Sequence, residues 1–173
     1  MTAQPILNND PAFVQGSIEW IATRNKYLGG SEIATIMGYN KYKTPYQLWQ
    51  QKTGIAPADE KTYAMERGNE LEPKALAYVE ETQGVKVSSQ PVLIHPEYDF
   101  IRVSLDGITE CDQYAIEVKS PMSANSETHV HATIGGACPL VHYCQVQMAI
   151  EVARHYYPDL KGAIIVRTLT KIL

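Results

Sequence analysis

Two short apolar runs, each carrying charge where a buried strand would not have it, constrain the fold of this chain most. The first run covers residues 100–105 and ends at Asp106, and the second covers residues 114–119 and contains Glu117 and Lys119. Both have the length and the β-branched and aromatic content of strands. The charges therefore need either a polar cleft or a solvent-exposed face beside the sheet.

The alternation within the second run indicates a cleft. Successive side chains of a strand point to opposite faces, so Glu117 and Lys119 project together, away from Ile116 and Val118. We expect residues 107–113 to connect the two runs as a hairpin. That pairing would bring Asp106 close to Glu117.

Helical patterns surround these runs. The capping box Thr44-Pro-Tyr-Gln47, with a proline at the first helical position, begins a helix that ends at Gly54. The other predicted helices cover residues 18–24, 31–38, 64–83 with a kink at Pro73, and 139–153. Further strands are predicted at residues 85–94, interrupted by Pro91, and at 163–169. This order predicts an α/β fold with a central mixed β-sheet flanked by helices.

Length and composition fit one soluble domain. The chain has 173 residues, of which 45% are hydrophobic and 20% charged. We expect residues 1–173 to form a single domain, with residues 1–16 as an extended N-terminal segment and residues 122–138 as a mobile loop. No apolar run is long enough for a membrane span, and residues 1–16 lack the pattern of a signal peptide. Three cysteines without paired spacing favour a reducing, cytoplasmic location.

Charge is unevenly distributed along the chain. The net charge of −4 disfavours a nucleic-acid binder when taken alone. Residues 19–53, however, hold five basic residues against two acids, whereas residues 57–83 hold seven acids against three bases. A basic entrance beside an acidic site would suit a metal-dependent enzyme acting on a polyanion, and a mixed solvated surface is the simpler alternative.

The three charged residues in the strands suit metal-assisted phosphodiester hydrolysis. Two carboxylates a few ångströms apart repel each other unless a cation lies between them, and Mg²⁺ prefers such oxygen ligands. A lysine beside them can orient or deprotonate the attacking water. An acid followed about ten residues later by Glu-x-Lys is nevertheless a weak signal by itself, because Glu-x-Lys also occurs on many exposed strands.

Five segments, in order, give the pattern more specificity. They are "RNKYLGGSEIATIMG", "TPYQLWQQKTG", "RGNELEP", "SLDG…IEVKSP" and "YCQVQMAI". Together these segments resemble the phage lambda exonuclease and YqaJ-like viral recombinase family, whose members have the restriction-endonuclease-like nuclease fold with a D…ExK motif. The resemblance covers about residues 17–153.

The resemblance implies a set of site residues. Asp106, Glu117 and Glu72 would hold the metal with the backbone carbonyl of Val118, and Lys119 would act on the attacking water. The metal would be Mg²⁺, with Mn²⁺ as an alternative.

It also implies residues that hold the substrate. Gln145 would orient the substrate or the nucleophile, with Gln147 on another face of its helix, and Arg24 and Ser31 would bind a 5′-phosphate. Ser31 after two glycines also predicts a helix N-terminus, where backbone N–H groups favour an anion; a plain N-cap is the simpler interpretation.

The function implied is a metal-dependent DNA exonuclease. It would digest linear duplex DNA from 5′-phosphorylated ends in the 5′-to-3′ direction and leave 3′ single-stranded tails for a phage-type annealing protein. The resemblance also implies a phage or prophage origin, a bacterial host cytoplasm and a homo-oligomer, specifically a homotrimer. The alternatives are an endonuclease of the same superfamily and a non-catalytic DNA-binding or interaction module that keeps the fold. A zinc site at His129, His131, Cys138, His142 and Cys144 is disfavoured because their spacing is not that of a structural site.

Overall fold

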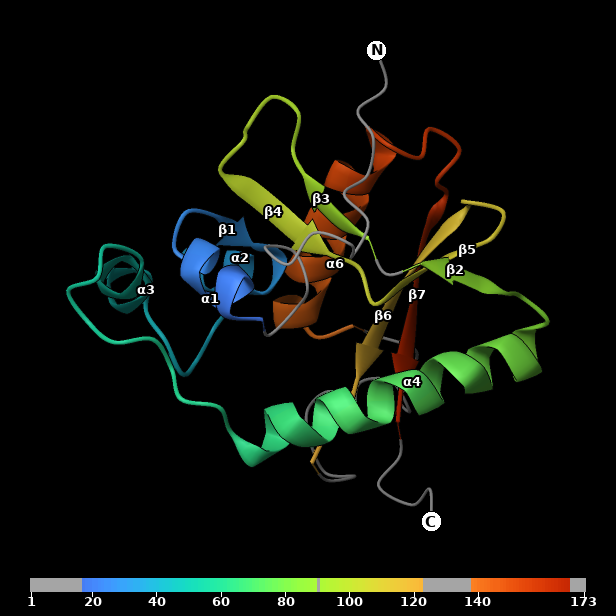
Figure 1. Ribbon diagram of the computed structural model, residues 1–173, viewed down its shortest axis with the longest axis horizontal. Coiled ribbons are helices and arrows are strands. Elements are labelled where there is room, and N and C mark those ends of the chain that lie inside the picture. The colour runs from blue at the N-terminus through green and yellow to red at the C-terminus, as the bar shows by residue number, and fades with distance from the viewer. Residues whose placement is uncertain (1–16, 90, 123–137, 169–173) are drawn as a thin grey trace.

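The computed structural model describes residues 17–89, 91–122 and 138–168 (Figure 1). Residues 1–16 and most of the predicted loop 122–138 lie outside the described residues. The helices are α1 (Ile18–Arg24), η2 (Gly30–Glu32, a 3-10 turn), α2 (Ile33–Ile36), α3 (Pro45–Lys52), α4 (Tyr63–Gln83) and α6 (Leu140–Arg154). The strands are β1 (Leu28–Gly29), β2 (Val87–Ser89), β3 (Val92–Ile94), β4 (Ile101–Ser104), β5 (Gly107–Thr109), β6 (Tyr114–Lys119) and β7 (Gly162–Arg167).

Local signals set the ends of the helices. Thr44 and Gln47 form the predicted capping box at the start of α3, with Thr44 Oγ1 accepting from the Gln47 N–H at 3.2 Å. Helix α4 ends at Gly84, whose φ of 65° lies in the left-handed region that favours glycine. Pro73 is accommodated inside α4, so the predicted helix runs its full length.

The strands form two mixed sheets in the described part of the chain. One has the order β1-β4-β3 and the other β2-β5-β6-β7, in which β6 and β7 are parallel. Helix α6 packs against strands of both sheets, as Figure 1 shows at the centre of the molecule. The α/β prediction is therefore confirmed, with the expected central sheet divided in two.

Two hydrophobic clusters cover opposite faces of the second sheet. On one face α6 packs its buried side chains, including Ala149 and Ala153, against Ile108 and Ala115. On the other face α4, which runs across the strands in Figure 1, packs against Ile116. Strand β6 is thus covered on both sides, and any polar side chain on it must be accommodated between helix and sheet.

The predicted pairing of the two apolar runs was wrong. Strand β6 pairs with β5, which begins at Gly107 inside the segment expected to be a turn, while β4 belongs to the other sheet. Asp106 lies between β4 and β5, where the chain passes from one sheet to the next. The predicted strand 85–94 is likewise divided, into β2 and β3 of different sheets, because Pro91 cannot donate a backbone hydrogen bond.

Among the residues that the structure describes, no helix is long and apolar enough to cross a membrane.

Candidate active site

The charged and apolar side chains of β6 separate to opposite faces, as the alternation predicts. Val118 packs with Ile116 in the cluster that faces α4. Glu117 is 5% exposed and bonds Gln145 of α6, on the other face. The chain therefore buries a carboxylate between sheet and helix, which is costly unless partners or a cation compensate its charge.

Glu117, Lys119 and Gln145 form a closed triangle of hydrogen bonds. Lys119 Nζ lies 2.5 Å from Glu117 Oε1 and donates to Gln145 Oε1 at 3.0 Å. Gln145 Nε2 donates to Glu117 Oε1 at 2.6 Å. The hydrogen bonds from Lys119 and Gln145 to this carboxylate both end on Oε1. Gln147, two residues along the helix, is exposed.

Asp106 lies beside this triangle. Its Oδ2 accepts a hydrogen bond from the Val118 N–H at 2.7 Å. Burial, together with the negative charges of Glu117 and Glu72, raises the pKa of Asp106 to about 7, against the Val118 hydrogen bond. A divalent cation bound between these carboxylates would relieve the repulsion between them.

Helix α4 contributes a third carboxylate, Glu72, to the acidic group. Glu72 lies half-buried on α4, and its charge acts on Asp106, so the two carboxylates are near each other. Glu70, two residues earlier on the helix, is exposed, as its position in the turn requires. Helix α4 and the end of β6 therefore contribute acids to the same place.

The backbone of Val118 faces the same edge of β6 as Asp106. In a parallel pair the N–H and C=O of one residue point to the same neighbouring strand, and successive residues alternate. The Lys119 carbonyl accepts from Thr168 on the β7 side, and the Val118 N–H donates to Asp106 on the other. The Val118 carbonyl is thereby directed toward the Asp106 side, where an oxygen ligand would be needed.

Ser31 does not occupy the predicted helix N-cap. It is exposed within the turn η2, which begins after Gly29, and α2 has only four residues. A helix this short has little dipole, so a helix N-terminus at Ser31 does not favour an anion there as predicted. The turn is nevertheless close to the acidic group, because a Cβ on Gly30 would lie 3.8 Å from Cγ of Gln145. Arg24 ends α1 and is half-buried.

Comparison with known proteins gives the family of the chain. Residues 19–156 match the YqaJ-like viral recombinase domain. The chain belongs to that family. It is 37% identical over 109 residues to the uncharacterized protein YqaJ of Bacillus subtilis (strain 168), an alignment that covers 62% of this chain and 34% of that protein. The aligned part is thus about a third of the length of this relative.

The fold is also similar to solved structures of an alkaline exonuclease, LHK-Exo, from Laribacter hongkongensis. One matches with a TM-score of 0.65 and 28% identity, and the other, a complex with dAMP, with a TM-score of 0.66 and 26% identity. Each match covers 90% of this chain and 75% of the exonuclease. The family and its neighbours therefore agree with the resemblance that the sequence motifs indicate.

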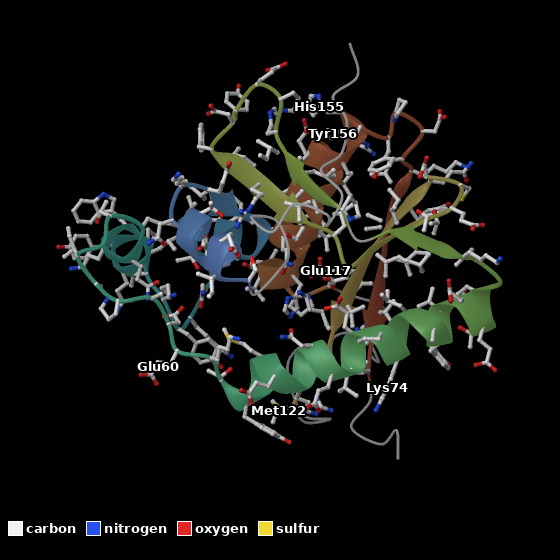
Figure 2. All side chains as sticks on the ribbon, viewed as in Figure 1. Glu60, Lys74, Glu117, Met122, His155 and Tyr156 are labelled. Carbon is white, nitrogen blue, oxygen red and sulfur yellow. The ribbon has the colours of Figure 1, made fainter. Side chains whose placement is uncertain are left out.

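This YqaJ-like chain contains a second group of residues of metal-ligating type, which sequence reasoning missed. Ligand atoms of His95, Glu151 and His155 lie within 4.8 Å of one another. Figure 2 shows His155 beside the end of α6, well away from Glu117. The spacing of Glu151 and His155, four residues apart on a helix, is the signal that could have identified this group.

The hydrogen bonds of His95 argue against a metal there. Its Nδ1 accepts the backbone N–H groups of Glu97 and Tyr98, both at 3.1 Å. The proton of the neutral ring must then be on Nε2, which leaves neither nitrogen with a lone pair for a metal. Glu151 and His155 alone are too few for a zinc site.

Proposed function

We propose that this chain is a Mg²⁺-dependent deoxyribonuclease that removes nucleotides from the 5′-phosphorylated ends of linear duplex DNA. The observation that carries the proposal is the ammonium of Lys119 held by Glu117 and Gln145 beside the half-buried Asp106. Strand and helix supply the parts of a hydrolytic site from separate elements. The LHK-Exo structures support an exonuclease that releases mononucleotides, because one of them is a complex with dAMP, a deoxynucleoside monophosphate of the kind that such a reaction would release.

Four oxygen ligands fit a hard divalent cation at this site. Asp106, Glu117 and Glu72 supply carboxylates, and Val118 supplies a carbonyl directed to the same edge. When bound, Mg²⁺ or Mn²⁺ would lower the pKa of water and neutralise charge developing on the phosphate. Burial raises the pKa of Asp106, and the charges of Glu117 and Glu72 add to that effect. A cation bound between these carboxylates would relieve their repulsion.

The remaining residues would position the nucleophile. The ammonium group of Lys119 contacts Glu117 Oε1, so its N–H groups can orient a water or the scissile phosphate beside the carboxylate. Gln145 fixes Lys119 through its amide oxygen and Glu117 through its amide nitrogen. Its role is to keep lysine and glutamate in one geometry during the attack.

Arg24 and Ser31 are proposed to hold the terminal 5′-phosphate. Support comes from the place of Ser31 on the turn that adjoins Gln145, and from the excess of basic residues between positions 19 and 53. A phosphate bound there would direct the next phosphodiester to the acidic group. This placement would make the enzyme an exonuclease acting in the 5′-to-3′ direction, leaving 3′ tails.

We also propose that the protein works as a homo-oligomer. Large apolar side chains are exposed on residues 36–65, here called the apolar arm, which Figure 1 shows reaching away from the sheets at α3. They are Ile36, Met37, Tyr39, Tyr42, Tyr46, Trp49, Ile55, Tyr63 and Met65. So many exposed apolar groups in one segment suit contact with a second copy. A homotrimer, a single-strand annealing partner and a bacterial host cytoplasm follow from the family and remain proposals.

The test uses linear duplex DNA labelled separately at the 5′ and 3′ ends, with and without a 5′-phosphate, in Mg²⁺ or in EDTA. We expect stepwise, metal-dependent loss from phosphorylated 5′ ends, abolished by Lys119→Ala. Cleavage of covalently closed circular DNA would instead indicate an endonuclease. A folded protein that binds DNA and cleaves nothing in Mg²⁺ or Mn²⁺ would be a binding module, and the enzyme proposal would be wrong.

A further inference from the structure

Lys52, at the end of α3, joins the segments that carry Arg24 and Ser31. Its Nζ donates to the carbonyl of Arg24 at 2.9 Å and to the carbonyl of Tyr27 at 2.6 Å, and it lies 2.8 Å from Glu32 Oε2. These partners are 20 or more positions away in the sequence, and the side chains of both Lys52 and Glu32 are largely buried. One ammonium thus ties α3 to the end of α1 and to η2.

Glu32 completes the connection at the other end of the segment. Its Oε2 also accepts the Gly29 N–H at 2.8 Å, so it closes the turn that contains Ser31. The backbone between Arg24 and Ser31 contains only the two-residue strand β1 and part of a 3-10 turn. Such short elements cannot hold two side chains at a fixed separation by themselves, and the buried ion pair supplies that constraint.

The surroundings of the pair carry an excess of positive charge. Burial lowers the pKa of Lys52, and the charges of Arg24 and Arg102 lower it further, against the effect of Glu32. Arg102 is 5% exposed and stacks on the ring of Tyr27, with its guanidinium carbon 4.7 Å from the ring centre. Three cations beside one acid are stabilised when an anion binds among them.

The ammonium of Lys52 has no donor left for that anion. A lysine has three N–H groups, and the two carbonyls and the Glu32 carboxylate account for all three. Lys52 therefore does not bind a phosphate directly. Its contribution would reach the substrate through the positions of Arg24 and Ser31.

We propose that the Glu32–Lys52 ion pair is a positioning device that sets the preference of this enzyme for phosphorylated over hydroxyl 5′ ends. The inference rests on the proposed function, in which Arg24 and Ser31 bind the terminal phosphate. Losing the pair would let the two groups move relative to each other. A terminal phosphate would then be held less well, while the acidic group at β6 would keep its own partners.

The experiment measures kcat/KM on matched duplexes with a 5′-phosphate and a 5′-hydroxyl end, and reports their ratio. Lys52→Met keeps the apolar stem and removes the ammonium. We expect the ratio to fall by about tenfold or more, mainly through KM on the phosphorylated end. Lys52→Arg, which keeps the charge and the donors, should lie between Lys52→Met and the unsubstituted protein. Lys74→Met removes the same charge from the exposed side of α4 (Figure 2) and should leave the ratio unchanged.

The outcomes separate this inference from the proposed function. If the unsubstituted protein cleaves nothing, or cleaves both ends equally, the proposed function or its end preference is wrong. If that protein discriminates and folded Lys52→Met discriminates equally well, the positioning inference is wrong. An equal loss on both ends would show a general structural role and would also overturn it. Glu32→Gln, with a milder expected fall in the ratio, decides the question if Lys52→Met does not fold.

Discussion

Gln145 and Gln147 show how strongly position decides the role of a side chain. Both lie on α6, two residues apart, yet Gln145 bonds Glu117 and Lys119 while Gln147 is exposed. The amide of Gln145 contacts β6, whereas the amide of Gln147 lies on another face of the helix. The pair is therefore a matched test of the proposed site.

Replacing Gln145 by alanine should lower kcat on phosphorylated duplex ends by about tenfold or more, because Lys119 and Glu117 lose the group that fixes their geometry. Gln147→Ala, on the same helix, should leave kcat near that of the unsubstituted protein. Single-turnover digestion of end-labelled DNA would measure the two variants. Equal rates for both would remove Gln145 from the site.

Asp106 should reduce the stability of the metal-free protein at neutral and higher pH. Its pKa is raised from 3.8 to about 7, so the folded state holds the proton more tightly than the unfolded state. Stability is then greatest below the unfolded pKa and falls as the pH rises from about 4 to about 7.

Asp106→Asn should therefore raise the free energy of unfolding in EDTA at pH 8 by roughly 1–3 kcal/mol, because the charge is removed while an oxygen remains for the Val118 N–H. The gain should be smaller at pH 4, where the carboxyl is largely protonated. Urea titrations at both values would measure it, with the exposed Asp99→Asn as control. A loss of stability at pH 8 would contradict the expected cost of the half-buried charge.

At the scale of elements, two glycines differ in what surrounds them. A Cβ on Gly107 would lie 2.6 Å from Cγ1 of Val87, where β5 and β2 meet. A Cβ on Gly68, inside α4, would meet nothing within 4 Å. Gly107 is thus needed for close strand packing next to Asp106, and Gly68 has no such steric reason.

We expect Gly107→Ala to lower the free energy of unfolding by about 1–3 kcal/mol, since β2 or β5 must shift to admit the methyl group. Gly68→Ala should raise it by about 0.5–1 kcal/mol, because alanine favours a helix interior over glycine. Chemical denaturation gives both values. The steric account fails if the two substitutions change stability in the same direction.

At the scale of the whole molecule, a single copy of the chain leaves the apolar side chains of the apolar arm exposed to solvent. Tyr46 and Trp49 stack on each other with ring centres 5.6 Å apart, and both are exposed on α3. Leu48, between them, is buried and holds the helix to the rest of the chain. The stacked rings are thus presented outward by an anchored helix.

Trp49→Glu should shift the protein toward monomer, because a charge would have to be buried in the contact between copies. Sedimentation equilibrium would measure the mass of both forms. Tyr78→Glu, at an exposed aromatic residue on α4, is the matched control and should leave the mass unchanged. Equal masses for all three proteins would exclude the arm around Trp49 as the contact.

The sequence by itself determined the local features of this protein. The caps of α3 and α4, the strand at residues 114–119 and the alternation of Glu117 with Ile116 follow from interactions within a few residues, and the structure shows each of them. The family followed from five ordered motifs, because their spacing carries information that composition does not.

Only the tertiary structure decided how those features come together. The pairing of β6 with β5 rather than β4, the contact of Gln145 with Glu117, and the reach of Lys52 to Arg24 join residues far apart in the chain. Such contacts depend on which sheet each strand enters, and short strands of similar composition do not specify that choice locally. The charges that were visible in the sequence therefore became a candidate site only once two helices and two sheets had placed them.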